Sequence, residues 1–171
     1  SILCGYGIVE KTGSKIELIE YGVINLKKLS PELPDRLKEI YQRLQRIIKT
    51  AKPECAVLEE TFYSKNPQSL IKLSHARGAA MVSCATAELP IHEYSPKEVK
   101  KSVTGNGNAT KEQVAYMVQS ILKIPETPEF FDATDALAVA LTHCYKFNMP
   151  TKLKGGWKEF IEKNPNRVLG K

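Results

Sequence analysis

Residues 55–60 read Cys-Ala-Val-Leu-Glu-Glu, a short continuous apolar run that ends in two carboxylates. An apolar run of this length, preceded by Pro53 and followed by charge, is typical of a strand buried on both faces of a sheet that helices cover. This stretch decides the fold class, because the segments on either side of it carry the signals of helices.

An amphipathic helix is predicted before the strand and another helix after it. Between Leu37 and Ile48, apolar residues recur at i, i+3, i+4 and i+7, the pattern of a helix of about five turns. Asn66 and Pro67 provide an N-cap and a first helical residue. They open a long helix, rich in small residues, that reaches about Ala87.

The remaining segments complete an α/β order. Residues 4–26 form two β-rich runs joined by a turn at 11–14, which predicts a hairpin, and residues 89–94 are a further strand candidate. Capping boxes at 95–98 and 110–113 open two helices. Thr127 and Pro128 open a last helix, and the regular pattern decays after Phe147. We therefore expect one domain over 1–147 and a basic C-terminal tail over 148–171.

Charge is unevenly distributed along the 171 residues, whose formal net charge is +6. Residues 1–145 contain 18 basic and 17 acidic residues, whereas residues 146–171 contain seven and two. A nearly neutral body with a basic tail favours a polyanionic partner such as nucleic acid, although many basic tails are only solvated ends. No signal peptide or membrane-spanning run is recognisable, so we expect no membrane partner.

The four cysteines and three histidines show no local metal-ligand spacing. No C-x-x-C pair occurs, and the cysteines are typical of small buried hydrophobic residues in a reducing cytoplasm. A zinc site is not expected from this pattern.

Three carboxylates stand at positions that suit a metal site. Glu59 ends the apolar strand, at the sheet edge where ligands bind in open α/β folds. Asp132 and Asp135 share one face of an otherwise apolar helix, and buried carboxylates need positive charge nearby. Oxygen ligands suit Mg²⁺ or Mn²⁺, and two such ions about 4 Å apart cleave phosphodiesters in many enzymes. The alternatives are a solvated strand end and stabilisation of the helix N-terminus by acidic side chains.

Aromatic and basic residues near these carboxylates suit DNA. Phe62 and Tyr63 lie in a polar loop, where they either stack on bases or cover the edge of the core. Lysines there would hold phosphate or neutralise charge that develops on it, or are simply solvated. They are Lys65, Lys100, Lys101 and Lys111.

Three stretches at matching distances resemble the RuvC-type Holliday-junction resolvases of bacteria. They are AVLEETFYSKNPQSLIKLSHARG at 56–78, EYSPKEVKKSVTGNGNATKEQV at 93–114 and DATDALAVALTHC at 132–144. The resemblance implies a ribonuclease-H-like fold with a five-stranded mixed sheet and helices on both faces. It also implies a homodimer that nicks opposed strands of four-way junction DNA with Mg²⁺. Dimerisation would use the helix from Pro67 onward, and a branch-migration motor complex is a further partner to consider.

The resemblance also implies roles for individual residues. Glu59, Asp132 and Asp135 take three of the family's four catalytic carboxylate positions, and Lys100 and Lys111 match lysines needed for cleavage. Phe62 matches the aromatic residue at the junction core, with Tyr63 beside it. Arg77 falls on a shared basic position, which we assign to DNA binding with Lys65 and Lys101.

The start of the sequence departs from the family pattern. Residues 4–7 read Cys-Gly-Tyr-Gly where the family has T-G-Y-G, and the family's first strand carries an Asp in G-I-D-P-G. We expect that strand just before Ser1, and without its Asp we expect a chain that binds junctions but cuts poorly. A non-cleaving junction-binding module is therefore the alternative function. We do not expect an ATP-using relative, because 171 residues leave no room for a second large domain.

Overall fold

The computed structural model describes residues 3–26, 32–61, 66–124 and 131–147, which form four strands and five helices. In chain order these are β1 (Leu3–Thr12), β2 (Lys15–Asn25), α1 (Leu33–Ala51), β3 (Ala56–Glu59), α2 (Pro67–Thr86), β4 (Ile91–Tyr94), α3 (Pro96–Thr104), α4 (Lys111–Leu122) and α5 (Phe131–Lys146). The α/β order predicted from the sequence is confirmed. The predicted opening of the last helix at Thr127 and the tail at 148–171 lie outside the described residues.

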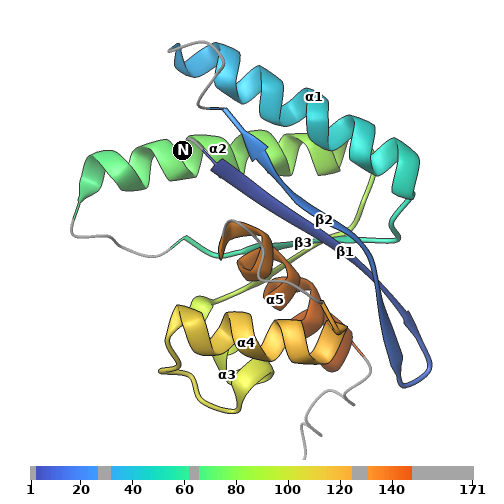
Figure 1. Cartoon of the computed structure of the whole chain (residues 1–171). Helices are drawn as coiled ribbons and strands as arrows, with labels where there is room; N and C mark the ends of the chain where they lie inside the picture. Colours follow the sequence, from blue (N-terminus) through green and yellow to red (C-terminus); the bar gives the residue numbers. More distant parts are fainter. Residues whose placement is uncertain (1–2, 27–31, 62–65, 125–130, 148–171) are drawn as a thin grey trace, which may run out of the picture.

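The predicted N-terminal hairpin is the antiparallel pair β1–β2 (Figure 1). Gly13 lies in the turn with φ +63°, a left-handed conformation that glycine adopts without steric cost. The register shifts between Ile8 and Val9, which marks a β-bulge. Such an irregularity increases the local twist, so the long ribbon can curve across α5.

The expected five-stranded mixed sheet is wrong for the described residues. β3 and β4 form a separate parallel pair, and no ladder joins them to β1 and β2. The physical reason is that no described strand lies between β1 and β3 to donate to both. With one partner strand only, Ala56, Val57 and Leu58 are half-buried rather than buried on both faces, as their apolar run had predicted.

The predicted helix caps are confirmed. At Ser95 and Thr110, the side-chain oxygen accepts a hydrogen bond from the backbone N–H of the residue three positions later. The side chain of that later residue in turn accepts a hydrogen bond from the backbone N–H of Ser95 or Thr110. Asn66 caps α2 by accepting from the backbone N–H of Ser69 at 3.2 Å. These reciprocal bonds fix where α3 and α4 begin, and with them the positions of Lys100 and Lys111.

Two apolar clusters form the core around α5 and around α1–α2. α5 lies against β1 and packs on α3 and α4, while α1 packs along α2 on the other side of the hairpin (Figure 1). The first cluster centres on residues of α5, of which Leu137 and Leu141 are fully buried. The second joins Ile24 and Leu26 to Ile40 and Ala76. The prediction that the last helix is buried is confirmed.

Two further sequence expectations concern the membrane and the cysteines. Among the described residues, no helix combines the length and apolar character that crossing a bilayer requires. All four cysteines are free; Cys84 and Cys144 are buried as expected, whereas Cys4 and Cys55 are only partly so.

Candidate active site

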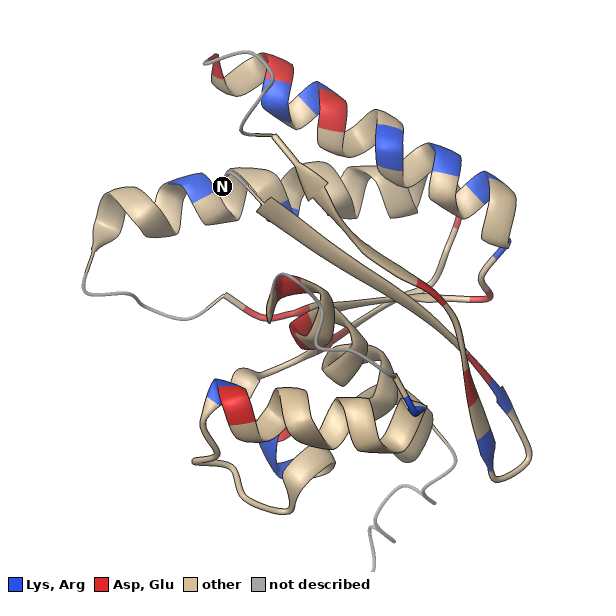
Figure 2. Ribbon diagram, in the orientation of Figure 1, with Lys and Arg blue, Asp and Glu red and all other residues tan. Residues whose placement is uncertain are grey.

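Glu59 ends β3 with an exposed carboxylate beside the first turns of α5, where Figure 2 shows acidic residues on both elements. Partial desolvation raises the pKa of this carboxyl, and the negative charge of Asp135 raises it further. Lys111 and Lys100 act in the opposite direction. One carboxylate and two lysines from other elements therefore lie near enough to Glu59 to act on its charge.

Asp132 and Asp135 are half-buried in the first turns of α5, and glycine allows β1 to approach them closely. A Cβ built on Gly5 would lie 1.9 Å from the carbonyl oxygen of Asp132. Beside it, burial and then the charge of Asp132 raise the pKa of the Cys4 thiol to about 11. Only a residue without a side chain fits at position 5, so Gly5 sets the distance between the hairpin and the acidic turn.

Lys111 connects the three carboxylates. Its Nζ donates to Asp135 Oδ2 at 2.9 Å from the first residue of α4. The hydrogen bond to Asp135 is the main reason that the pKa of Lys111 is raised, and the charges of Asp135, Asp132 and Glu59 add to it. The structure therefore brings Lys111 to the same site as Glu59, Asp132 and Asp135, as the sequence predicted.

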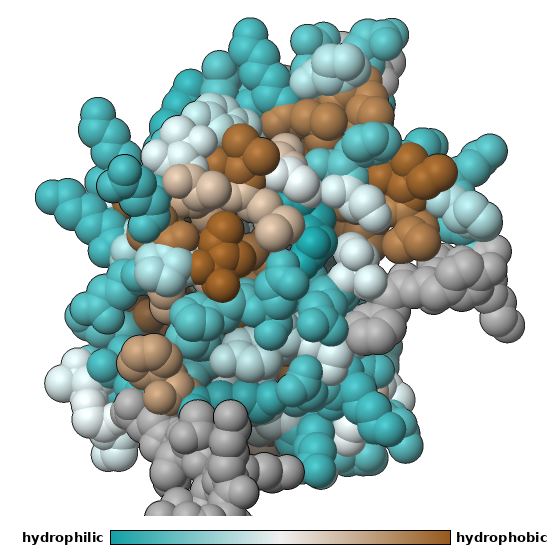
Figure 3. Space-filling view, turned by 180° about the vertical axis from the view of Figure 1, so that it is seen from behind, coloured by the Kyte–Doolittle hydropathy of each residue, from teal (hydrophilic) through white to brown (hydrophobic). Residues whose placement is uncertain are grey.

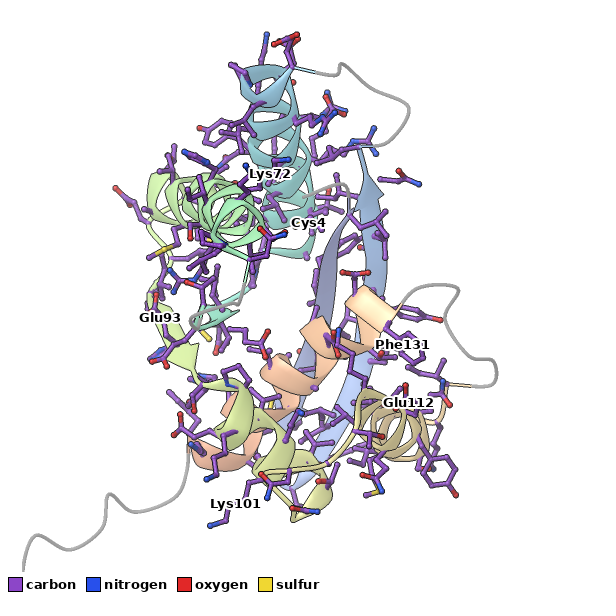
Figure 4. All side chains as sticks on the ribbon, turned by 90° about the vertical axis from the view of Figure 1, so that its left-hand side faces the viewer. Cys4, Lys72, Glu93, Lys101, Glu112 and Phe131 are labelled. Atoms are coloured by element: carbon purple, nitrogen blue, oxygen red, sulfur yellow. The ribbon has the colours of Figure 1, made fainter. Side chains whose placement is uncertain are left out.

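The other predicted basic residues occupy different positions. Lys100, in α3, faces Glu59 closely enough to lower its pKa, whereas Lys101 projects away from the fold (Figure 4). Arg77, in α2, turns inward. Its Nε donates to the backbone carbonyl of Glu59 at 3.1 Å, and its guanidinium pairs with Glu93. Arg77 thus fixes the end of β3 from the side of α2.

Phe62, Tyr63 and Lys65, predicted to contact DNA, lie outside the described residues. The predictions for these three residues therefore remain predictions.

The carboxylates fit a divalent cation by their chemistry. Three negatively charged oxygen donors with a lysine among them are the kind of donor set that hard ions such as Mg²⁺ prefer. The pairing of Lys111 with Asp135 satisfies part of this charge within the protein itself.

A second group of potential ligands was missed from the sequence. Cys55, His92 and His143 place one ligand atom each so that all lie within 4.8 Å of one another. In the part of the chain that the structure describes, this is the one group of three or more such side chains at that spacing. Local spacing could not have found it, because the three residues come from three elements. Gly5 and the inward role of Arg77 were missed for the same reason.

Carboxylates and lysines gathered at the end of a strand and the start of a helix are typical of metal-dependent phosphodiester hydrolases with an α/β fold. Comparison with known proteins specifies the family. The family model of crossover junction endodeoxyribonuclease RuvC matches residues 1–143.

Similar curated proteins carry the same description. One from Cytophaga hutchinsonii is 42% identical over 164 residues, covering 96% of this chain and 82% of its own. Another, from Pseudoalteromonas translucida, is 45% identical over 155 residues, covering 91% and 87%.

Solved structures agree. Thermus thermophilus RuvC in complex with a Holliday junction substrate superposes with a TM-score of 0.75 at 31% identity, covering 86% of this chain and 89% of that one. The chain belongs to the RuvC family of crossover junction endodeoxyribonucleases, whose members are metal-dependent nucleases with a ribonuclease-H-like fold.

Proposed function

We propose that this chain is an endonuclease that resolves four-way DNA junctions in recombination and repair by paired nicks that leave 5′-phosphate and 3′-hydroxyl ends. The observation that carries the proposal is the coupling of Glu59, Asp132 and Asp135 through Lys111 at one end of β3 and α5. The likeness to a junction-bound RuvC over most of the chain supports the choice of substrate.

Glu59, Asp132 and Asp135 are the residues that would hold Mg²⁺, or Mn²⁺ in its place, with two ions as the proposed number. Ions held there supply activation of water and stabilisation of the leaving oxygen. The pKa of Glu59 is raised, so its carboxylate is lost at a higher pH than an ordinary glutamate would lose it. We therefore expect metal binding, and with it cleavage, to weaken as the pH falls through that raised pKa.

Lys111 and Lys100 place positive charge beside the scissile phosphate. The Lys111 ammonium is oriented by Asp135 at 2.9 Å, so it is fixed before substrate arrives. A preorganised cation stabilises charge that develops on the phosphoryl oxygens without reorganisation during the reaction. Arg77 acts one step away, because it fixes the backbone of Glu59 rather than the phosphate.

DNA contacts outside this site complete the proposal. Phe62 is proposed to hold open the strand exchange point with Tyr63 beside it, and Lys65 and Lys101 to contact phosphate. The basic tail at 148–171 is proposed as an auxiliary DNA contact. Residues 146–171 contain seven Lys or Arg residues and two acidic residues, so this end of the chain attracts phosphate.

A homodimer is proposed to place two such sites on opposed strands. α2 exposes three large apolar side chains, Ile71, Leu73 and Val82, each 48–57% accessible in the single chain. Figure 3 shows apolar patches on the face seen from behind, at the level of α1 and α2. Exposed apolar area of this kind favours a protein interface, and α2 is the helix expected to provide it. A motor complex as a further partner remains a proposal.

The test is nicking of a synthetic four-way junction by the full-length protein with Mg²⁺, with binding followed in Ca²⁺. We expect Glu59→Gln and Asp132→Asn to abolish nicking and to retain junction affinity. Unchanged rates in both variants would overturn the metal-site assignment. Tight, salt-sensitive binding without cutting at any Mg²⁺ or Mn²⁺ concentration would instead establish the non-cleaving alternative, which the comparisons do not favour.

A further inference from the structure

Cys55, His92 and His143 form a compact group at the end of β3 opposite Glu59. Cys55 directly precedes β3, His92 lies in β4 and His143 lies in the last turns of α5. Their ligand atoms are within 4.8 Å of one another, and the two imidazole rings have centroids 4.4 Å apart. His143 is buried, whereas Cys55 and His92 are half-buried, so the group is closed on one side and reachable on the other.

The strand register explains why the three meet. His92 pairs with Val57 in the parallel ladder, and side chains alternate along a strand. Cys55, Val57 and His92 therefore project from the same face. Val57 packs into the core cluster built on α5, so this face is the one that α5 covers. His143, which belongs to α5, therefore faces Cys55 and His92 where α5 packs against β3 and β4.

A neighbouring hydrogen bond orients one of the imidazoles. The Tyr94 hydroxyl and His143 Nδ1 are 2.9 Å apart, which engages Nδ1 and leaves Nε2 as the atom available to a ligand. The ring of Phe147 covers His143 with centroids 5.1 Å apart. An imidazole whose second nitrogen is fixed by a hydrogen bond is the usual arrangement of a metal-ligating histidine.

The group is separate from the carboxylates, although it shares two elements with them. His143 lies eleven positions after Asp132 in α5, which corresponds to about 16 Å at 1.5 Å per residue. Glu59 lies four positions after Cys55, which corresponds to about 13 Å along an extended strand. A negative charge, Glu54, lies near Cys55, and a positive charge, Lys11, lies near His143.

We propose that Cys55, His92 and His143 bind Zn²⁺ through one thiolate and two imidazole nitrogens, with a fourth position open to water. Sulfur and nitrogen donors suit Zn²⁺ and are poor ligands for Mg²⁺. Zn–S bonds of about 2.3 Å and Zn–N bonds of about 2.0 Å require the three atoms to close by about 1 Å, which side-chain rotation allows. The ion would tie β3, β4 and α5 together at the end opposite the carboxylates.

Co²⁺ titration of the metal-free full chain tests the site, because a Co²⁺–thiolate bond gives a charge-transfer absorption that carboxylate sites lack. We expect the band in the wild type and its loss in Cys55→Ala. His92→Gln should weaken Co²⁺ affinity by at least about tenfold. Cys84→Ala and His75→Gln are matched controls, a cysteine and a histidine of α2 outside the group, and both should retain the band.

Tyr94→Phe distinguishes a ligand set from a mere cluster. It removes the hydroxyl bonded to His143 and keeps the ring in the core, so the band should persist with affinity reduced about tenfold. Far-UV circular dichroism of each variant shows that the chain is folded. The proposal is overturned if the folded wild type gives no band, if the band survives Cys55→Ala, or if Cys84→Ala removes it as effectively.

Discussion

The two ends of β3 and α5 present opposite kinds of metal chemistry. At one end Glu59, Asp132 and Asp135 offer oxygen donors with Lys111 among them. At the other, Cys55 and His143 offer sulfur and nitrogen, and β4 adds His92. Because β3 and α5 run past each other in opposite directions, each element contributes to both sites. Donor type, and not position on the fold, therefore separates the ion proposed to serve catalysis from the ion proposed to serve stability.

The largest effect is expected from removing oxygen donors. Asp135→Asn removes a negative charge that pairs with Lys111 and lies near Glu59. We therefore expect cleavage of a four-way junction to fall by about 100-fold or more. The Co²⁺–thiolate band at the other end should be unchanged. Single-turnover nicking and the absorption titration measure the two effects on the same preparation. A cleavage rate within threefold of wild type would break the distinction between the ends.

Arg77→Met separates positioning of Glu59 from contact with DNA. Loss of the 3.1 Å bond to the Glu59 carbonyl should lower the cleavage rate about 10- to 100-fold and leave junction affinity nearly unchanged. If Arg77 contacts phosphate instead, affinity falls and the slope of log affinity against log salt decreases by about one. Lys101→Met is the matched control, since Lys101 projects from α3, and should change affinity but not the rate of bound enzyme.

Gly5→Ala tests whether close approach of β1 sets the geometry of the acidic turn. The added methyl would collide with the Asp132 carbonyl at 1.9 Å, so we expect a loss of about 1–3 kcal/mol of unfolding free energy. Denaturant unfolding measures it. Gly78→Ala in α2 is the control, because nothing lies within 4 Å of its Cβ and it should stabilise by about 0.5–1 kcal/mol. Equal effects of both substitutions would contradict the packing argument.

The smallest effect concerns the stability cost of Glu59. Its pKa is raised in the fold, so the native state binds a proton more readily than the unfolded chain. Stability therefore falls as the pH rises from the ordinary carboxyl pKa through the raised one. Glu59→Gln removes this cost, so metal-free protein at neutral pH should melt at a higher temperature than the wild type, with the difference vanishing below about pH 4. A lower melting temperature at neutral pH would contradict the assignment.

Much of the fold follows from local patterns. The hairpin, the helices and the capping boxes at Ser95 and Thr110 depend on residues close together in the chain, and the structure has them as predicted. The five-stranded sheet did not follow, because pairing between β1 and β3 depends on a neighbour that local sequence does not specify. The family resemblance predicted five strands in one sheet, whereas the described residues form four strands in two sheets.

The two sites differ in how far the sequence reveals them. Asp132 and Asp135 share a helix face, so their spacing is informative, and Glu59 is marked by the apolar strand that it ends. Cys55, His92 and His143 are dozens of residues apart, and only the register of β3 with β4 and the packing of α5 bring them together. The expectation that no zinc site exists rested on local spacing alone. The inward turn of Arg77 was hidden in the same way.

The central claim is tested most directly by counting bound ions in three proteins after dialysis against Zn²⁺ and Mn²⁺ together. The wild type should hold both metals. Cys55→Ala should lose Zn²⁺ and keep Mn²⁺, and the double variant Glu59→Gln, Asp132→Asn should lose Mn²⁺ and keep Zn²⁺. If one set of substitutions removes both metals, or neither set removes its own, the two ends are not separate sites of different donor chemistry.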